Sequence, residues 1–269
     1  ANNIILSASA LIVLIGTVYP IFYESFFERQ LTMGRSFYDI LVGPLLLILV
    51  YLMAFSTKVT KVNLNLKKWI IQNQNEINIT LVISIISTVY FKASYKFVFA
   101  IFGSVLLSVI ILKNIITRLK RTKLQGTYWT GQVSHLGIGI FTIGLILNVT
   151  QSFSNELIIS AGDTVNFGDK NFTILSPYEE IKQEKNVINL PIEFDNKEKN
   201  ASLNIFKNSS QQAISSPAVF RSIESDTYIT IKVIDDDKFK LIFRENYGIF
   251  ILWLGLATSS ASFLTRVKK

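Results

Sequence analysis

His135 is the one histidine in this sequence of 269 residues, and its surroundings make it the residue best suited to chemistry. It lies several residues inside an apolar stretch, residues 128–149, that is long enough to cross a bilayer. A titratable ring is costly to bury in hydrocarbon, so such a residue indicates a functional site. The sequence has no Cys, which excludes a thiolate metal site, a thiol catalyst and a disulfide framework. His135 is therefore the main candidate ligand for a metal ion or a redox cofactor.

Gly131 and Gly139 lie one helical turn before and after His135, on the same face of the predicted helix. Small residues at these positions leave room for a flat macrocycle stacked against the helix beside the imidazole. The same spacing also lets two helices approach closely, and a histidine can serve such packing through hydrogen bonds. The spacing thus leaves two interpretations open for His135, a cofactor ligand and a packing residue.

The composition is typical of a membrane protein, because 49% of the residues are hydrophobic and the mean hydropathy is +0.38. The formal net charge of +8 could indicate nucleic-acid binding. The basic residues, however, gather at the ends of apolar runs, and they form no stripe interleaved with aromatic residues. We therefore expect a membrane protein that binds no nucleic acid.

Six stretches are apolar enough to predict membrane-spanning helices, and the third is the shortest: residues 3–22, 38–55, 77–91, 97–116, 128–149 and 247–264. Lysines and arginines concentrate in three segments: after the second stretch, after the fourth and at the C-terminus. These three segments fall on one side of the membrane if there are six spans. The positive-inside rule makes that side the cytoplasm or matrix, with both termini on it.

Residues 150–245 differ from the rest, because their acidic residues outnumber the basic ones and their pattern changes to period two. Alternation is clearest over residues 228–234 and 238–243, and shorter strands are expected at 157–160, 164–167 and 172–175. The predicted fold is an α-helical integral membrane protein of about six transmembrane helices, with an antiparallel β domain inserted between the last two. Its parts are a five-helix region (1–149), an outer-face β domain (150–245) and a last helix with a basic end (246–269).

Several motifs in a fixed order resemble one known family. They are Gly-Thr-Val-Tyr-Pro at 16–20, Gly34 with Phe37 and Tyr38, His-Leu-Gly at 135–137, Ala-Gly-Asp at 161–163 and Trp-Leu-Gly at 253–255. In this order, over essentially the whole chain, they resemble the C-terminal part of CcmF, the membrane haem lyase subunit of cytochrome c maturation. The resemblance implies that His135 is one axial ligand of a transmembrane b haem. Gly131 and Gly139 would then clear the haem face.

Haem propionates favour cations at the membrane boundary, and three basic residues near the inner end of this helix are plausible partners: Arg118, Lys120 and Arg121. Ordinary positive-inside topology also explains them fully. A bis-histidine haem needs two imidazoles, and this chain has one. The resemblance therefore implies either a haem b shared with a partner polypeptide that supplies the second histidine, as in split, mitochondrially encoded versions of the protein, or a sequence that is a fragment of a longer chain.

The sequence lacks the family's tryptophan-rich haem-handling segment, so we do not expect this chain to be an active lyase alone. The implied function is to relay electrons, with quinol as a possible donor, to haem that is being attached to apocytochrome c. The implied partners are the N-terminal half of the lyase, a haem chaperone, thiol-reducing subunits and apocytochrome c. The abundance of Asn, Ile, Lys and Phe is typical of an A+T-rich genome, as in an organelle or a reduced bacterium. We favour the mitochondrial inner membrane, with the bacterial cytoplasmic membrane as the alternative.

Two other interpretations stay open. The chain could be a structural subunit of an inner-membrane respiratory or transport assembly, with His135 as a packing residue. It could also be half of a transporter, which is disfavoured because the sequence has no nucleotide motif and no inverted repeat, and because the six spans are taken to be free of charged side chains.

Overall fold

The computed structural model describes residues 2–27, 31, 33–56, 66–91, 97–119, 126–207, 213–235 and 238–264. The chain divides into two compact units. The first, Ala1–Ile146 with Ile251–Lys269, is helical, and the second, Leu147–Phe250, is built mainly of strands. The fold class predicted from the sequence is confirmed: membrane-type helices accompany an antiparallel β domain that lies between the last two helices in the chain.

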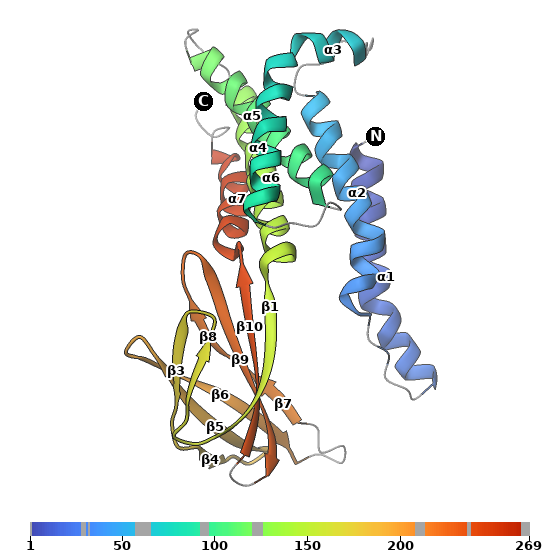
Figure 1. Cartoon of the computed structure of the whole chain (residues 1–269). Helices are drawn as coiled ribbons and strands as arrows, with labels where there is room; N and C mark the ends of the chain where they lie inside the picture. Colours follow the sequence, from blue (N-terminus) through green and yellow to red (C-terminus); the bar gives the residue numbers. More distant parts are fainter. Residues whose placement is uncertain are drawn as a thin grey trace. The chain divides into compact units, whose positions relative to one another are not determined.

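The helices follow the apolar stretches of the sequence (Figure 1). In chain order they are α1 (Asn2–Phe27), α2 (Arg35–Ser56), α3 (Leu66–Gln72), α4 (Gln74–Tyr90), α5 (Val98–Leu119), α6 (Gly126–Gln151) and α7 (Ile249–Ala261). Among the described residues, four helices are long and apolar enough to cross a membrane, namely α1, α2, α5 and α6. Helix α4 has 17 residues and α7 has 13, which is shorter than the ~20 residues that a span needs. Helices thus form in all six predicted stretches, and two of them are short.

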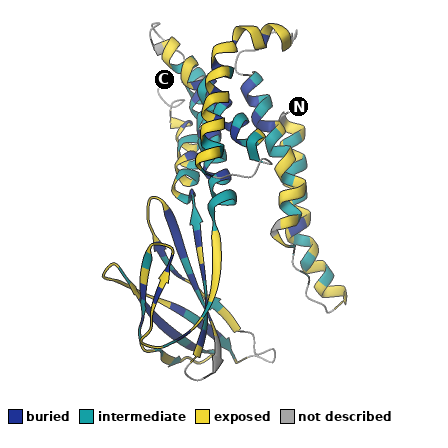
Figure 2. Cartoon of the chain, viewed as in Figure 1, coloured by how far each residue is buried: buried dark blue, intermediate teal, exposed yellow. Residues whose placement is uncertain are grey.

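Helices α2 and α5 pack together through a cluster of buried aliphatic side chains, to which α3 adds an aromatic ring. The buried members are Leu49, Val50, Met53, Ala54, Trp69, Leu106, Leu107, Ile110 and Ile111. The hydroxyl of Tyr51 in α2 donates a hydrogen bond to the carbonyl oxygen of Phe99 in α5, at 2.8 Å. Most large apolar side chains of α1 are exposed, and much of its ribbon is accordingly coloured yellow in Figure 2. Exposed apolar surface of this kind suits contact with lipid or with another protein.

The expectation that the spans are free of charge is wrong. Lys113 lies within the fourth predicted stretch and forms an ion pair with Glu76 at the beginning of α4. Glu76 is buried, whereas the side chain of Lys113 is 45% exposed. A buried carboxylate needs such a partner, because an unpaired charge is strongly disfavoured away from water. The pair therefore joins α4 to α5 near the ends that the charge bias assigns to the inner side.

The β unit contains two antiparallel sheets. The four-stranded sheet has the order β1-β10-β9-β8, where the strands are β1 (Phe153–Ser160), β8 (Ala218–Arg221), β9 (Ser225–Asp235) and β10 (Lys238–Tyr247). The second sheet has the order β2-β3-β5-β6-β7, and β4 also pairs with β5. Its strands are β2 (Thr164–Phe167), β3 (Lys170–Ile174), β4 (Tyr178–Ile181), β5 (Lys185–Phe194), β6 (Lys197–Phe206) and β7 (Ala213–Ser216).

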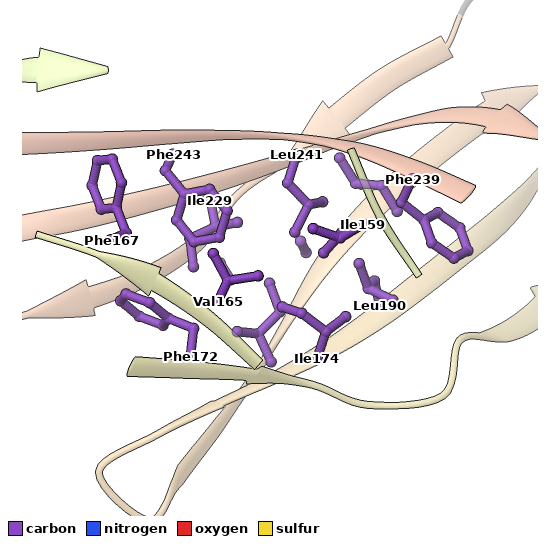
Figure 3. Close-up of a cluster of buried hydrophobic side chains, with 14 of the residues drawn as sticks. Ile159, Val165, Phe167, Phe172, Ile174, Leu190, Ile229, Phe239, Leu241 and Phe243 are labelled. Carbon is purple, nitrogen blue, oxygen red and sulfur yellow. The ribbon is translucent and has the colours of Figure 1, made fainter. Parts of the chain in front are cut away.

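The two sheets bury one apolar core, which Figure 3 shows from close by. On β10, Phe239, Leu241 and Phe243 alternate with exposed or half-buried residues, so every second side chain enters the core. On β9, Ile229 and Ile231 do the same. Period-two alternation in the sequence therefore predicted the buried face of this hairpin correctly. The residues that connect the two strands, 236 and 237, lie outside the described residues.

A two-residue turn joins β5 to β6, the longest hairpin of the second sheet. Phe194 pairs with Lys197, and the residues between them, Asp195 and Asn196, have φ of 52° and 57°. Positive φ at both central positions is typical of the hairpin turn whose twist matches that of the strands. Asp and Asn tolerate this conformation because their short side chains can hydrogen-bond locally. The turn thus fixes the register that places Leu190 and Ile192 in the core.

Candidate functional site on helix α6

Helix α6 carries His135 nine residues after its first residue, Gly126. The side chain of His135 is half-buried. The helix has no Asp, Glu, Lys or Arg, and its residues are mainly apolar or small. It can therefore pack against neighbours on more than one face. The glycines of the helix show which of its faces contact neighbours, because a Cβ atom built on a glycine meets other atoms where a face is covered.

Gly137 and Gly139 are packing positions. A Cβ atom on Gly137 would lie 2.4 Å from the backbone nitrogen of Ser259 in α7. A Cβ atom on Gly139 would lie 2.5 Å from Oγ of Ser108 in α5. Two faces of α6 are thus covered by neighbouring helices. The clearance that the sequence led us to expect at Gly139 is taken up by α5.

Gly131 is different, because in the described part of the chain no atom outside its own stretch of helix backbone lies within 4 Å of a Cβ built on it. It precedes His135 by one turn, and a helical side chain covers the turn on the N-terminal side of its own Cα. The imidazole and the open glycine therefore share one region of the helix surface. Of the two flanking glycines, Gly131 is the one that leaves free space beside His135.

Helices α5 and α6 run antiparallel, and two contacts fix their register. The guanidinium carbon of Arg118 lies 4.3 Å from the centre of the Tyr128 ring, near the end of α5 and the beginning of α6. Further along, Ser108 lies against Gly139. Arg118 is therefore held by an aromatic face at the level where α6 begins. The other two predicted propionate partners, Lys120 and Arg121, lie outside the described residues.

Gln132 is a buried polar residue that the sequence analysis did not single out. It lies one turn before His135 and is only 7% exposed. Its side-chain oxygen Oε1 has no hydrogen-bond partner in the described part of the chain. Nothing in the sequence pattern separates it from other polar residues near a helix end, so burial is the signal that reveals it. Over the same described residues, no group of three or more His, Cys, Asp or Glu side chains could hold a metal ion.

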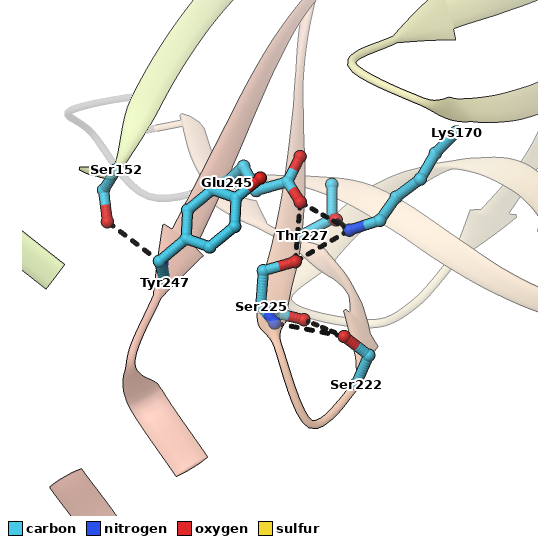
Figure 4. A network of polar contacts seen from close by, with 7 residues as sticks. All are labelled: Ser152, Lys170, Ser222, Ser225, Thr227, Glu245 and Tyr247. Atoms are coloured by element: carbon cyan, nitrogen blue, oxygen red, sulfur yellow. Dashed lines mark hydrogen bonds and ion pairs between the residues drawn. The ribbon is translucent and has the colours of Figure 1, made fainter. Parts of the chain in front are cut away.

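A second polar site, also missed from the sequence, closes one end of the β sandwich (Figure 4). Lys170 donates hydrogen bonds to Oε1 of Glu245 at 2.6 Å, to the hydroxyl of Ser225 at 2.9 Å and to the hydroxyl of Thr227 at 3.0 Å. Ser225 in turn donates to Oε1 of Glu245 at 2.6 Å. Glu245 is 1% exposed, so this is a buried ion pair. Lys170 belongs to one sheet and the other three residues to the opposite sheet, so the pair ties the two sheets together.

The same region connects the end of α6 to the end of β10. The amide of Asn148 donates to the hydroxyl of Ser152 and to the carbonyl oxygen of Tyr247, both at 3.2 Å. The Ser152 hydroxyl also accepts a hydrogen bond from the backbone nitrogen of Tyr247, at 3.1 Å, as Figure 4 shows. These bonds hold the two chain segments that lead into and out of the sandwich next to each other.

Burial raises the pKa of the Asp226 carboxyl, although Arg221 and a backbone hydrogen bond from Ser222 act in the opposite direction. On the exposed edge strand β1, a hydrogen bond from Lys240 lowers the pKa of Glu156. Protonation in acid therefore relieves a burial cost at Asp226 and removes a favourable interaction at Glu156.

No protein-family profile matches the sequence, but individual known proteins are similar to it. The chain is 26% identical over 183 residues to the cytochrome c-type biogenesis protein CcmF of Pseudomonas aeruginosa, covering 64% of this chain and 27% of the relative. It is 23% identical over 184 residues to CcmF of Escherichia coli, with the same two coverages. It is 25% identical over 183 residues to the biogenesis protein ccl1 of Rhodobacter capsulatus, covering 65% and 28%.

The solved structure of cytochrome c haem lyase CcmF matches the whole of this chain with a TM-score of 0.74 and 12% sequence identity, over 45% of its own length. The helices and the inserted β sandwich thus define a helical membrane protein of the CcmF fold. The chain is similar in sequence and fold to the CcmF-type proteins of cytochrome c biogenesis, consistent with their C-terminal part. It spans about a quarter of the length of the curated relatives that it matches.

Proposed function

We propose that this chain supplies one half of a haem b site in a cytochrome c haem lyase, with His135 as one axial ligand of the iron. The observation that supports this most directly is the position of the sole histidine, inside an apolar helix and beside the free space at Gly131. The sequence relation to CcmF-type proteins supplies the chemical context.

The residues around His135 fit such a group on one side of α6. An imidazole nitrogen is an ordinary axial ligand of haem iron, and open space at Gly131 accommodates a flat ring. The side of Gly139 is filled by Ser108 and α5, so the room for the macrocycle lies toward Gly131. When bound, haem b supplies one-electron chemistry. The role of this chain is to hold the ligand nitrogen in place and to keep water away from that half of the site.

The second axial histidine belongs to a partner polypeptide in this proposal, because the sequence contains one histidine. The N-terminal half of the lyase is that partner, and it also supplies the tryptophan-rich segment that this sequence lacks. Arg118, which begins the basic segment after α5, would meet a haem propionate near the inner boundary, together with Lys120 and Arg121. The electron relay from quinol to haem that is being attached to apocytochrome c is the function we assign to the assembled pair.

The β sandwich is the partner-binding part of the chain in this proposal. The lysine and arginine bias puts both termini on the matrix or cytoplasmic side, so the sandwich faces the intermembrane space or periplasm. There it would meet the N-terminal half, the haem chaperone, the thiol-reducing subunits and apocytochrome c. We favour the mitochondrial inner membrane as the location. The domain boundaries proposed from the sequence, at residues 149 and 245, lie close to those of the compact unit Leu147–Phe250.

A difference spectrum tests the axial ligand. The chain is purified with its natural partner polypeptide, and reduced-minus-oxidised absorbance is recorded for the wild type and for His135→Ala. We expect a b-type spectrum in the wild type and its loss in the variant, with the partner still bound. Thr142→Val is the matched control, because Thr142 lies on the same helix and its hydroxyl bonds the carbonyl oxygen of Ile138. This control should keep the spectrum.

A structural subunit is the second candidate function, and one observation favours it. The closest helix contacts of α6 lie next to His135 in sequence, at Gly137 and Gly139, so this part of α6 is a packing element whatever else it does. In that case His135→Ala would leave the spectrum unchanged, or no b-type spectrum would be found, and the variant would weaken assembly with the partner instead.

A further inference from the structure

We propose that Gln132 is a positioning residue for His135: its carboxamide oxygen accepts a hydrogen bond from the imidazole N–H that does not face the iron. This inference rests on the proposed axial role of His135. It assigns to a residue outside the motifs of the sequence a share in setting the electronic properties of the site.

The burial of Gln132 is the first observation. A side chain that is 7% exposed and has no partner for its Oε1 in the described part of the chain is rare, because most buried polar atoms are hydrogen-bonded. Leaving such an acceptor unsatisfied in the interior is unfavourable. The structure thus retains a buried acceptor beside the one histidine of the chain.

No hydrogen bond reaches this oxygen from the described residues of the neighbouring helix. The contacts of Arg118 with Tyr128 and of Ser108 with Gly139 set the register of α5 against α6. By interpolation between these contacts, Gln132 lies at the level of Asn114 and Ile115. Ile115 is an apolar residue packed against the core between α2 and α5. Asn114 is polar, but it forms no hydrogen bond with Oε1 of Gln132.

His135 is the polar residue that follows Gln132 by one turn of α6. Residues three apart on a helix are neighbours, with about 5–6 Å between their Cβ atoms. The imidazole also leans toward the N-terminal end of α6, over the turn that contains Gln132. In this proposal, rotation about the side-chain bonds of Gln132 places its oxygen against the ring nitrogen. Ser134 is engaged elsewhere, since its hydroxyl lies 3.3 Å from that of Ser259.

The chemical consequence follows from how axial histidines are held. A ligating imidazole donates its second N–H to an acceptor, which fixes the tautomer and the ring plane and makes the ligand nitrogen more basic. A more basic ligand favours the oxidised iron and lowers the midpoint potential. Gln132 would therefore tune the potential of the haem without touching it.

Redox titration of the purified chain with its partner polypeptide tests the inference, with wild type, Gln132→Leu and Gln132→Glu compared. Gln132→Leu removes the acceptor and should raise the midpoint potential. Gln132→Glu supplies a stronger acceptor of the same length and should lower it. Electron paramagnetic resonance of the oxidised protein reports the same change as a shift in g values. Thr142→Val, a polar residue on α6 bonded to its own helix, should leave both readouts unchanged.

Each outcome decides a separate point. If haem is bound and both Gln132 variants have the wild-type potential and g values, Gln132 does not position the ring, whereas the axial role of His135 stands. If His135→Ala keeps a wild-type spectrum, the proposed function fails and this inference fails with it. If Gln132→Leu does not accumulate, Gln132→Glu decides alone, because a wild-type potential in that variant overturns the inference.

Discussion

Gly137 of α6 and Gly255 of α7 approach each other so closely that neither position has room for a side chain. A Cβ atom on Gly137 would lie 2.7 Å from the carbonyl oxygen of Gly255, and one on Gly255 would lie 2.3 Å from the backbone nitrogen of Phe141. Both glycines belong to motifs of the sequence, His-Leu-Gly and Trp-Leu-Gly. Helix packing therefore explains Gly137 of the His-Leu-Gly motif. It does not explain His135, which is the residue of that motif to which we assign a chemical role.

The first prediction concerns this crossing. Gly137→Ala and Gly255→Ala should each destabilise the helical unit by about 1–3 kcal/mol, because overpacking forces the backbones of α6 and α7 apart. The measurement is unfolding of the detergent-solubilised chain by a denaturant, followed by tryptophan fluorescence, since Trp129 and Trp253 lie on these two helices.

Gly43→Ala in α2 is the control for the crossing. Apart from its own helix backbone, no atom of the described residues lies within 4 Å of a Cβ built on Gly43, so alanine meets free space there. Replacing a helix-interior glycine with alanine favours the helix by about 0.5–1 kcal/mol. If Gly43→Ala is as destabilising as Gly137→Ala, the close contact between α6 and α7 is not the cause of the loss.

The second prediction separates the two glycines that flank His135. Gly131→Leu should reduce haem occupancy with little effect on folding, because the side chain would fill the free space beside the imidazole. Gly139→Leu should reduce both haem occupancy and stability, because it pushes against Ser108 and separates α5 from α6. Haem content per chain and the denaturation midpoint are measured together. Equal haem content in Gly131→Leu and the wild type would mean that the ring does not lie on that side.

The sequence predicted those parts of the fold in which apolar residues follow a regular pattern. Apolar runs predicted the helices, and alternation predicted the β9–β10 hairpin, because burial in lipid or in a sandwich demands these patterns. Span length was harder, since α7 begins at Ile249 after the positive φ of Gly248 and ends at Ala261. The predicted stretch, residues 247–264, extends beyond both ends of this helix. Hydropathy alone does not report where a helix begins or ends.

Polar contacts between distant segments could not be predicted in the same way. The period-two rows of inward residues on β3 and β10 end at Lys170 and Glu245, which a strict alternation would have flagged as core-facing charges. Their pairing depends on how the two sheets are stacked, and a single sequence carries no such information. The ion pair of Glu76 and Lys113 was missed for a related reason, because the residues come from different helices.

The third prediction concerns the ion pair in the sandwich. Glu245→Ala should destabilise the β unit by about 3–5 kcal/mol, because it leaves the ammonium of Lys170 buried without its charge partner. The double variant Lys170→Met, Glu245→Leu should regain much of this loss, since apolar residues suit the neighbouring core. Amide hydrogen exchange of β9 and β10 measures the effect locally.

An exposed ion pair on the same sheet serves as the control for the third prediction. Glu156 pairs with Lys240 across β1 and β10, and its side chain is 53% exposed. Glu156→Gln should therefore change the exchange rates of β9 and β10 little, because exposed pairs contribute little to stability. If Glu156→Gln and Glu245→Ala lowered the exchange protection of β9 and β10 to a similar extent, burial would not determine how much an ion pair contributes to stability.

The fourth prediction is a pH dependence carried by Asp226. Burial raises the pKa of this carboxyl in the folded state above its unfolded value, so the folded protein binds the proton more tightly. Stability should therefore fall as the pH rises from the unfolded pKa, near 4, through the raised folded pKa, as the ionised carboxylate becomes costly to bury. Asp226→Asn removes this cost, and it should be more stable than the wild type at neutral pH and lose this part of the pH dependence. Denaturation midpoints of both proteins between about pH 4 and pH 7 measure the difference. Parallel pH profiles for the two proteins would contradict the prediction, because they would mean that Arg221 and the Ser222 backbone bond fully offset the burial of Asp226.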